Sequence, residues 1–167
     1  MNGGNVMNTT KLLDLLRENA RITNAQLATM LGTTEDAVAA EIARLEADGI
    51  IIGYSAIIDE EKADETRVTA IIDLKITPMK DHGFDDLAHT IMKYDEVDTV
   101  TLLSGSSDLS VTITGTSLRT VALFVSERLS TLEGVLSTTT HFVLRRYKEK
   151  KHIFGEDSSD ERSLVSP

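Results

Sequence analysis

The chain has 167 residues, 41% of them hydrophobic and 26% charged, and it contains no cysteine. This balance is that of a globular protein with one ordinary domain or two small ones, and the lack of cysteine excludes disulfides and thiolate metal sites. The net charge of −10, from 17 basic and 27 acidic residues, opposes the approach of the protein to a polyanion such as DNA.

Two short helices are predicted near the start of the chain. Residues 11–20 carry leucines at helical spacing and predict an amphipathic helix. Thr23 is followed three residues later by Gln26, which is the spacing of a capping box that begins a second helix. Gly32 then provides a stop that tolerates a left-handed backbone.

A third helix is predicted directly after this stop. Thr34 can cap it, and Val38, Ile42 and Leu45 form its buried stripe. Two short helices joined at a glycine turn and preceded by a supporting helix predict a helix-turn-helix from Thr23 to Glu46.

The pattern changes after this helical unit. Residues 50–58 are rich in β-branched side chains and predict an exit strand, so we expect a helix-turn-helix domain over residues 1–58. The charged run that follows predicts a hinge over residues 59–66.

The second half of the sequence predicts a small sheet domain over residues 67–150. Strands and helices follow in the order β-α-β-β-α-β, which is the ferredoxin-like split unit with both helices on one side of an antiparallel sheet. The fold class is therefore α+β. The predicted elements are a strand at 68–76 closed by Pro78, a helix at 84–91, strands at 97–104 and 108–115, a helix at 118–132 and a strand at 135–147.

The sheet face turned away from the predicted helices mixes polar and apolar side chains. It is either a solvated face or a subunit interface at which two sheets pack together, and we favour the interface because half-apolar, β-branched stripes on a small domain usually have a partner. The predicted members are Thr69, Ile71, Thr99, Thr101, Leu103, Thr112, Thr114 and Val143.

The end of the chain is polar. We expect residues 151–167 to form a disordered tail. A dense basic cluster precedes and enters it, and such a cluster either meets phosphate or, more commonly, forms a solvated strand end. Its members are Arg145, Arg146, Lys148, Lys150 and Lys151.

Three stretches of this sequence are similar to one known family. RITNAQLATMLG at 21–32, ARLEADGIIIGY at 43–54 and SGSSDL at 104–109, together with the order of elements from residue 11 to 148, resemble the Lrp/AsnC family of feast/famine transcriptional regulators. The resemblance implies a regulator that forms homo-dimers through its C-terminal sheets, often assembles further into octamers, and binds an amino acid or related metabolite between dimers.

The same resemblance assigns an effector site to one loop. Ser104, Gly105 and Asp108 fall in the loop that contributes to the family's effector site. Glycine permits close approach of a ligand to the backbone, serine offers donors and acceptors, and Asp108 could pair with an α-ammonium group. The alternative is an ordinary hairpin connection in which Asp108 makes an Asx-type turn.

The third helix departs from the family's usual basic DNA-reading helix. Its outer face carries Glu35, Asp36 and Glu41, and Arg44 is its one cation. We therefore expect weak binding to DNA per subunit and a shallow dependence on salt. The residues expected at the DNA are Thr33, Thr34, Ala39, Ala40 and Arg44.

Two functions remain open from the sequence. The first is a ligand-responsive transcriptional regulator that gathers weak helix-turn-helix units by avidity. The second is an oligomeric metabolite-binding or interaction module that has lost DNA binding.

An enzyme is a third candidate, since some proteins similar to this family act in haem biosynthesis. We expect no catalytic residue, metal or cofactor, because His82, His89, His141 and His152 lack the spacing of a metal site and no acid accompanies a nucleophile. No apolar run approaches the roughly 20 residues that span a bilayer, and residues 1–10 lack the pattern of a secretory signal, so we expect a cytoplasmic protein.

Overall fold

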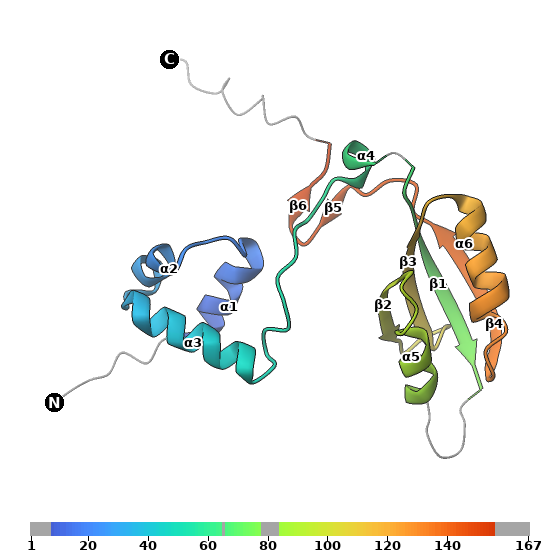
Figure 1. Cartoon of the computed structure of the whole chain (residues 1–167), viewed down its shortest axis with the longest axis horizontal. Helices are drawn as coiled ribbons and strands as arrows, with labels where there is room; N and C mark the ends of the chain where they lie inside the picture. The colour runs from blue at the N-terminus through green and yellow to red at the C-terminus, as the bar shows by residue number, and fades with distance from the viewer. Residues whose placement is uncertain (1–7, 65, 78–83, 156–167) are drawn as a thin grey trace. The chain divides into compact units, whose positions relative to one another are not determined.

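The computed structural model covers the whole chain and describes residues 8–64, 66–77 and 84–155. The chain divides into two compact units, residues 1–57 with 147–167, and residues 58–146 (Figure 1). The predicted strand stop at Pro78, His82, and the part of the predicted tail beyond residue 155 lie outside the described residues.

The first unit contains three helices with the predicted caps. They are α1 (Thr9–Glu18), α2 (Asn24–Leu31) and α3 (Glu35–Ala47). The Oγ1 of Thr23 accepts from the backbone N–H of Gln26 and the side chain of Gln26 accepts in return, which completes the capping box. Gly32 has a φ of +66°, and the Oγ1 of Thr34 caps α3. The predicted helix-turn-helix is therefore confirmed.

A small apolar core holds these helices together. Leu12 from α1, Leu27 from α2, and Val38 and Leu45 from α3 are fully buried, and Ile42 is partly buried against them. The stripe predicted for the third helix thus faces the other two helices, which leaves the opposite surface of α3 exposed.

The exit strand predicted at residues 50–58 is wrong for the chain by itself. This segment pairs with no strand of the described chain. Its apolar side chains are left open to solvent: Ile52 is 95% exposed, and Tyr54 and Ile58 are about half exposed. A strand exists only through hydrogen bonds to a neighbour, so β-branched composition alone does not make one. In the predicted hinge, a short helix α4 (Glu60–Ala63) follows.

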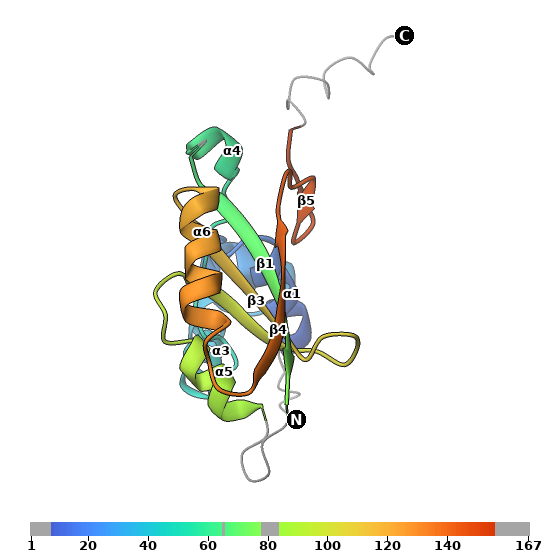
Figure 2. The ribbon, with the colours of Figure 1, turned by 90° about the vertical axis from the view of Figure 1, so that its right-hand side faces the viewer.

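The second unit is a four-stranded antiparallel sheet with both helices on one side (Figure 2). Its strands run in the order β2-β3-β1-β4. This confirms the predicted ferredoxin-like arrangement. The strands are β1 (Val68–Ile76), β2 (Val97–Leu102), β3 (Leu109–Gly115) and β4 (Val135–Phe142); the helices are α5 (Asp85–Ile91) and α6 (Leu118–Phe124), which continues as a π-helical turn η1 (Val125–Leu129).

Strict alternation along the central strands sets the two faces of the sheet. In β1 every second residue, including Ile72 and Leu74, is buried under the helices, and the paired residues Val111 and Leu109 of β3 are buried with them. The intervening residues therefore point to the open face.

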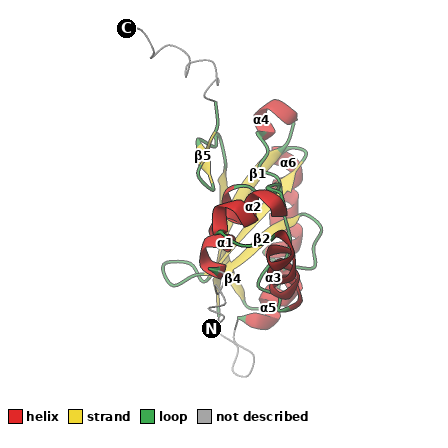
Figure 3. Ribbon diagram, turned by 90° about the vertical axis from the view of Figure 1, so that its left-hand side faces the viewer, coloured by secondary structure: helices red, strands yellow, loops and turns green. Residues whose placement is uncertain are grey.

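The end of the chain differs from the prediction. The last strand of the sheet ends at Phe142 rather than Tyr147, and β5 (Lys148–Glu149) pairs with β6 (His152–Ile153) in a separate hairpin (Figure 3). The boundary predicted between residues 150 and 151 thus falls inside a hairpin that groups with the helix-turn-helix unit. The disordered tail predicted to begin at residue 151 is therefore wrong for residues 151–155, which form the hairpin turn, β6 and the residues directly after it. Sequence rules place such two-residue turns at Asn-Gly or Gly-containing pairs, and Lys150-Lys151 is neither.

Candidate nucleic-acid interface and effector site

The outer surface of α3 is the predicted DNA-reading surface, and it is largely uncharged or acidic. Ala39 and Ala40, both expected at the DNA, are exposed. Thr34 is exposed at the start of the helix, and Thr33 beside it is partly buried. Glu35 and Asp36 occupy the first turn of α3, where their charges stabilise the helix terminus but repel phosphate.

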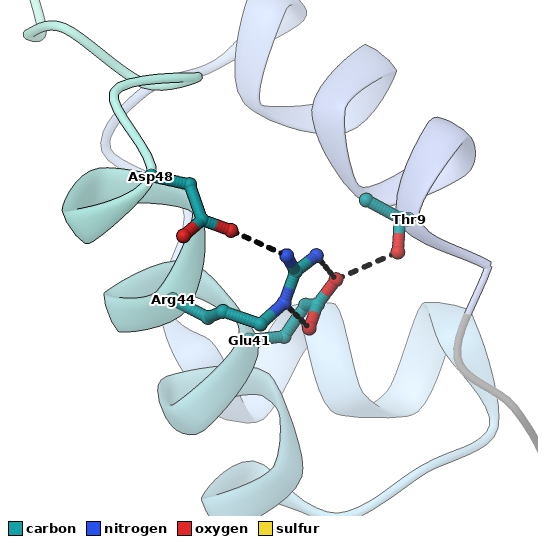
Figure 4. Close-up of polar contacts among 4 residues, drawn as sticks. All are labelled: Thr9, Glu41, Arg44 and Asp48. Atoms are coloured by element: carbon teal, nitrogen blue, oxygen red, sulfur yellow. Dashed lines mark hydrogen bonds and ion pairs between the residues drawn. The ribbon is translucent and has the colours of Figure 1, made fainter.

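Arg44 is held inside a network of acidic partners (Figure 4). Its Nε donates to Oε2 of Glu41 at 2.9 Å and its Nη2 to Oε1 of Glu41 at 2.8 Å, which makes a bidentate pair. Its Nη1 donates to Oδ2 of Asp48 at 2.7 Å. The hydroxyl of Thr9 on α1 donates to Oε1 of Glu41 at 2.7 Å and fixes that carboxylate from the other side.

These contacts shift the pKa values of Glu41 and Arg44 in opposite directions. The hydrogen bonds from Arg44 and Thr9 lower the pKa of Glu41 to about 2, and the carboxylate beside it raises the pKa of Arg44. The Glu41 side chain is only 17% exposed, whereas that of Arg44 is 51% exposed. In the protein without DNA, the one cation of α3 is therefore paired with Glu41 of the same helix and with Asp48 at its end.

Most other basic side chains of the helix-turn-helix are likewise bonded to groups of the same unit. Residues 8–57 hold four basic and seven acidic side chains. Arg17 pairs with Asp14 at 2.7 Å, and the ammonium of Lys11 donates to the carbonyl of Met30 at 3.0 Å. Arg21, in the turn before α2, is the one basic side chain of residues 8–57 with no such contact to the described residues.

The predicted effector loop joins β2 to β3. Ser104 and Gly105 are exposed there, and a side chain at Gly105 would meet nothing within 4 Å. Asp108 instead reaches the neighbouring strand, where its Oδ1 accepts from the Nζ of Lys75 at 3.0 Å and its Oδ2 from the backbone N–H of Ile76 at 2.8 Å. Neither partner of Asp108 was predicted from the sequence, because both lie more than 30 residues away along the chain.

The hydrogen bonds from Ile76 and Lys75 lower the pKa of Asp108 and keep it ionised. These contacts lie across the sheet rather than within the loop, so they are not those of the Asx-type turn that we considered. Asp108 anchors the end of the loop to β1, while Ser104 and Gly105 remain open to a ligand.

A cavity of about 190 Å³ lies where this loop begins and ends. Leu102 and Leu109, which flank the loop and pair across the two strands, line it together with residues of α5. Met92 and Leu102 are each more than half exposed at its edge. No cavity was predicted here from the sequence, although Ala88 and Met92 stand four residues apart. The lining residues are Phe84, Asp85, Ala88, His89, Met92, Val100, Leu102 and Leu109.

The open face of the sheet carries the predicted mixture of side chains. The register places Thr69 and Ile71 of β1 on it opposite Thr114 and Thr112 of β3. Thr99 and Thr101 join them from β2, since they pair with Thr112 and Ser110. A polar pair on the same face was not predicted from the sequence: Nε2 of His141 lies 3.5 Å from Oδ2 of Asp73.

A helix-turn-helix followed by a ferredoxin-like domain with a cavity beside an open loop defines a two-domain DNA-binding regulator. Residues 8–52 match the family described as winged helix-turn-helix DNA-binding, and residues 69–153 match the one described as Lrp/AsnC ligand binding domain. The chain therefore belongs to the Lrp/AsnC family, and it is a transcriptional regulator with a DNA-binding and a ligand-binding domain.

Individual relatives agree with this assignment. The chain is 46% identical over 159 residues to an uncharacterised helix-turn-helix regulator, YugG, of Bacillus subtilis, covering 95% of this chain and 96% of that one. It is 31% identical to the regulator LysM of Sulfurisphaera tokodaii over 81% of this chain and 91% of the other. A crystal structure of the regulator NMB0573 of Neisseria meningitidis in complex with L-Met superposes with a TM-score of 0.68 at 25% identity, covering 94% and 96% of the two chains.

These relatives are named as transcriptional regulators, which are not enzymes. Within the described residues, no helix is both long and apolar enough to cross a bilayer.

Proposed function

We propose that this regulator responds to an amino acid with an apolar side chain, bound beside the β2–β3 loop. The observation that carries the proposal is the apolar cavity between α5 and the strands that flank this loop. Its lining of Phe84, Met92 and Leu102 suits an aliphatic side chain, because removal of apolar surface from water favours binding by roughly 25 cal/mol per Å².

The polar part of such a ligand would meet the loop itself. The hydroxyl of Ser104 and the backbone at Gly105 are exposed and can bond a carboxylate or an ammonium group. Asp108 already accepts from Lys75 and Ile76, so we propose that it mainly holds the loop in position. The L-Met complex of the Neisseria regulator and the name of the leucine-responsive regulatory protein of Haemophilus influenzae, 25% identical to this chain, support this class of ligand.

We further propose that the protein acts as a homo-dimer or larger homo-oligomer. The open face carries Ile71, 38% exposed, among threonines, and this half-apolar surface is suited to a second copy of the same sheet. The unpaired segment at residues 50–58, with Ile52 and Tyr54 exposed, offers a second place at which a copy can add a strand.

Oligomerisation would offset the weak contact that we propose for each α3. Arg44 is already paired with Glu41 and Asp48, so each helix-turn-helix contributes little phosphate attraction of its own. Several such units on one DNA bind more tightly than any one of them. The same ion pairs favour the competing proposal, an oligomeric ligand-binding module without DNA binding. A protein that acts on DNA belongs in the cytoplasm, and we propose that location.

Binding to the promoter region of its own gene, measured over a range of salt with and without leucine, methionine and polar amino acids, tests these proposals. We expect salt-sensitive binding that an apolar amino acid shifts and a polar one does not. No binding at low salt would instead favour the module without DNA binding.

A cavity-filling variant tests the effector site separately. Ala88→Phe fills the cavity and is expected to abolish the response to the amino acid while DNA binding persists. Ala122→Phe, at an exposed position of α6, is the matched control. An unchanged response in Ala88→Phe would show that the ligand binds elsewhere.

A further inference from the structure

The β5–β6 hairpin is a compact basic element attached to the helix-turn-helix unit. Lys148 pairs with Ile153 and Glu149 with His152, so Lys150 and Lys151 form a two-residue turn at the tip. The backbone N–H of Phe154 donates to the carbonyl of Tyr147 at 3.0 Å and extends the pairing. Three of the six residues from 148 to 153 are lysines.

The two tip lysines adopt an unfavourable backbone conformation. Lys150 has a φ of 43° and Lys151 a φ of 75°, and they are the non-glycine residues with positive φ in the described chain. Asn-Gly is the sequence that fits such a turn with least strain, because a β-carbon crowds the following carbonyl in the left-handed region. Lysine does not favour the backbone conformation of this turn, so a structural reason for two lysines at the tip is lacking. We infer that their positive charge is the reason they are there.

An ion pair fixes where the tip lies. The Nζ of Lys151 is 3.0 Å from Oε1 of Glu18, the last residue of α1. This single contact leaves the Lys151 side chain 75% exposed and open to a phosphate, whereas Arg44 is held by three hydrogen bonds to two carboxylates. Arg21, the exposed basic side chain in the turn before α2, follows Glu18 by three residues. In a helix-turn-helix, the helix that precedes the recognition helix crosses the DNA backbone, so this turn is where phosphates are expected. Lys148 and Lys150 form no ion pair with any residue in 8–64, 66–77 or 84–155.

We propose that the β5–β6 hairpin is a second DNA-contacting element, which binds the phosphate backbone beside the start of α2 through Lys148, Lys150 and Lys151. It supplies, from the far end of the chain, the cations that α3 lacks. The inference rests on DNA binding by the helix-turn-helix. Contacts to phosphate carry no sequence information, so the hairpin strengthens binding to every DNA by the same factor.

The decisive variant is Lys150→Asn/Lys151→Gly, which removes both charges while installing the favoured turn sequence. In the full-length protein, we expect the Kd for a duplex carrying its own promoter and for a random duplex to rise by the same factor, about 60-fold at 0.1 M salt. The slope of log affinity against log salt is expected to become shallower by about 1.8. The melting temperature of the helix-turn-helix is expected not to fall, which excludes unfolding as the cause.

Two control variants complete the test. Lys62→Gln/Lys93→Gln removes the same charge from the other unit and is expected to leave the salt slope unchanged. Lys150→Arg/Lys151→Arg keeps the charge and is expected to retain wild-type affinity.

The possible failures are distinguishable. If the Asn-Gly variant binds like the wild type, or if the control in the other unit loses as much affinity, the hairpin does not contact DNA. If the wild type binds neither duplex at low salt, DNA binding by the helix-turn-helix fails, and this inference fails with it.

Discussion

The two units of this chain bury similar cores but leave very different surfaces. Within the described residues, both cores are purely apolar, from Leu12 and Leu45 in one to Ile72 and Leu109 in the other. In the helix-turn-helix, most basic side chains are satisfied inside the unit, Arg44 by Glu41 and Asp48 above all. In the sheet unit, a face that carries Ile71 among threonines and other polar side chains is left open.

The contrast between these two surfaces illustrates two different reasons for which a small domain needs a partner. The open face of the sheet unit exposes apolar side chains, and a second copy of the chain is proposed to stabilise the unit by burying them. The helix-turn-helix has little available positive charge beyond Arg21, so we expect other parts of the protein, or several copies together, to contribute to the attraction of DNA. Four substitutions test this contrast.

The largest effect is expected from the small helical core. Leu45→Ala removes a fully buried side chain and is expected to cost roughly 2–5 kcal/mol, enough to unfold the helix-turn-helix while the sheet unit persists. Thermal unfolding followed by circular dichroism should then show a lost or lowered first transition. Ile52→Ala, at a side chain 95% exposed, is the control that should leave this transition in place. A shift of both transitions together would mean that the units unfold as one.

The open face is tested by Ile71→Asp. A carboxylate buried between two sheets without a partner costs several kcal/mol, so the oligomer is expected to dissociate at concentrations where the wild type does not. Sedimentation velocity over a concentration series measures this. Leu118→Asp, at an exposed position on the helical side, is the control. A wild type that is monomeric at all concentrations would contradict the proposed interface.

Release of Arg44 is tested by Glu41→Gln. Loss of the Glu41 carboxylate leaves Asp48 as the remaining acidic partner of Arg44 and opens the Nε and Nη2 donors to a phosphate. We therefore expect DNA affinity at 0.1 M salt to rise about tenfold and the salt slope to steepen by about 0.9. Glu46→Gln removes the same charge from the same helix without touching Arg44 and should have a smaller effect. Equal effects of the two variants would show that only the overall charge of α3 matters.

The smallest effect concerns acid sensitivity of the sheet unit. Hydrogen bonds from Ile76 and Lys75 hold the pKa of Asp108 below its ordinary value of 3.8, so its contribution to stability is present above about pH 4 and is lost as the pH falls through the lowered pKa. The melting temperature of the sheet unit, followed by circular dichroism, is expected to fall below pH 4. Asp108→Asn should make this fall less steep. The exposed Asp95→Asn should leave that decline as it is. A decline that persists unchanged in Asp108→Asn would show that other carboxyl groups cause it.

The sequence by itself determined the features that depend on near neighbours. The capping box of Thr23, the left-handed Gly32 and the cap at Thr34 each involve groups within a few residues, and so they were predictable. The alternation in β1 likewise revealed the faces of the sheet, because side chains along a strand alternate with period two. Even the pairing of Arg44 with Glu41 and Asp48 was available from spacings of three and four residues.

Only the tertiary structure decided the features that join distant parts of the chain. The anchoring of Asp108 to Lys75 crosses 33 residues, the contact of Lys151 with Glu18 crosses 133, and the cavity exists only once α5 lies against β2 and β3. The predicted exit strand failed for the same reason, since hydrogen bonding to another segment decides whether residues 50–58 form a strand. Local sequence specifies caps, turns and faces, whereas contacts across the fold determine which of the exposed groups remain available to bind.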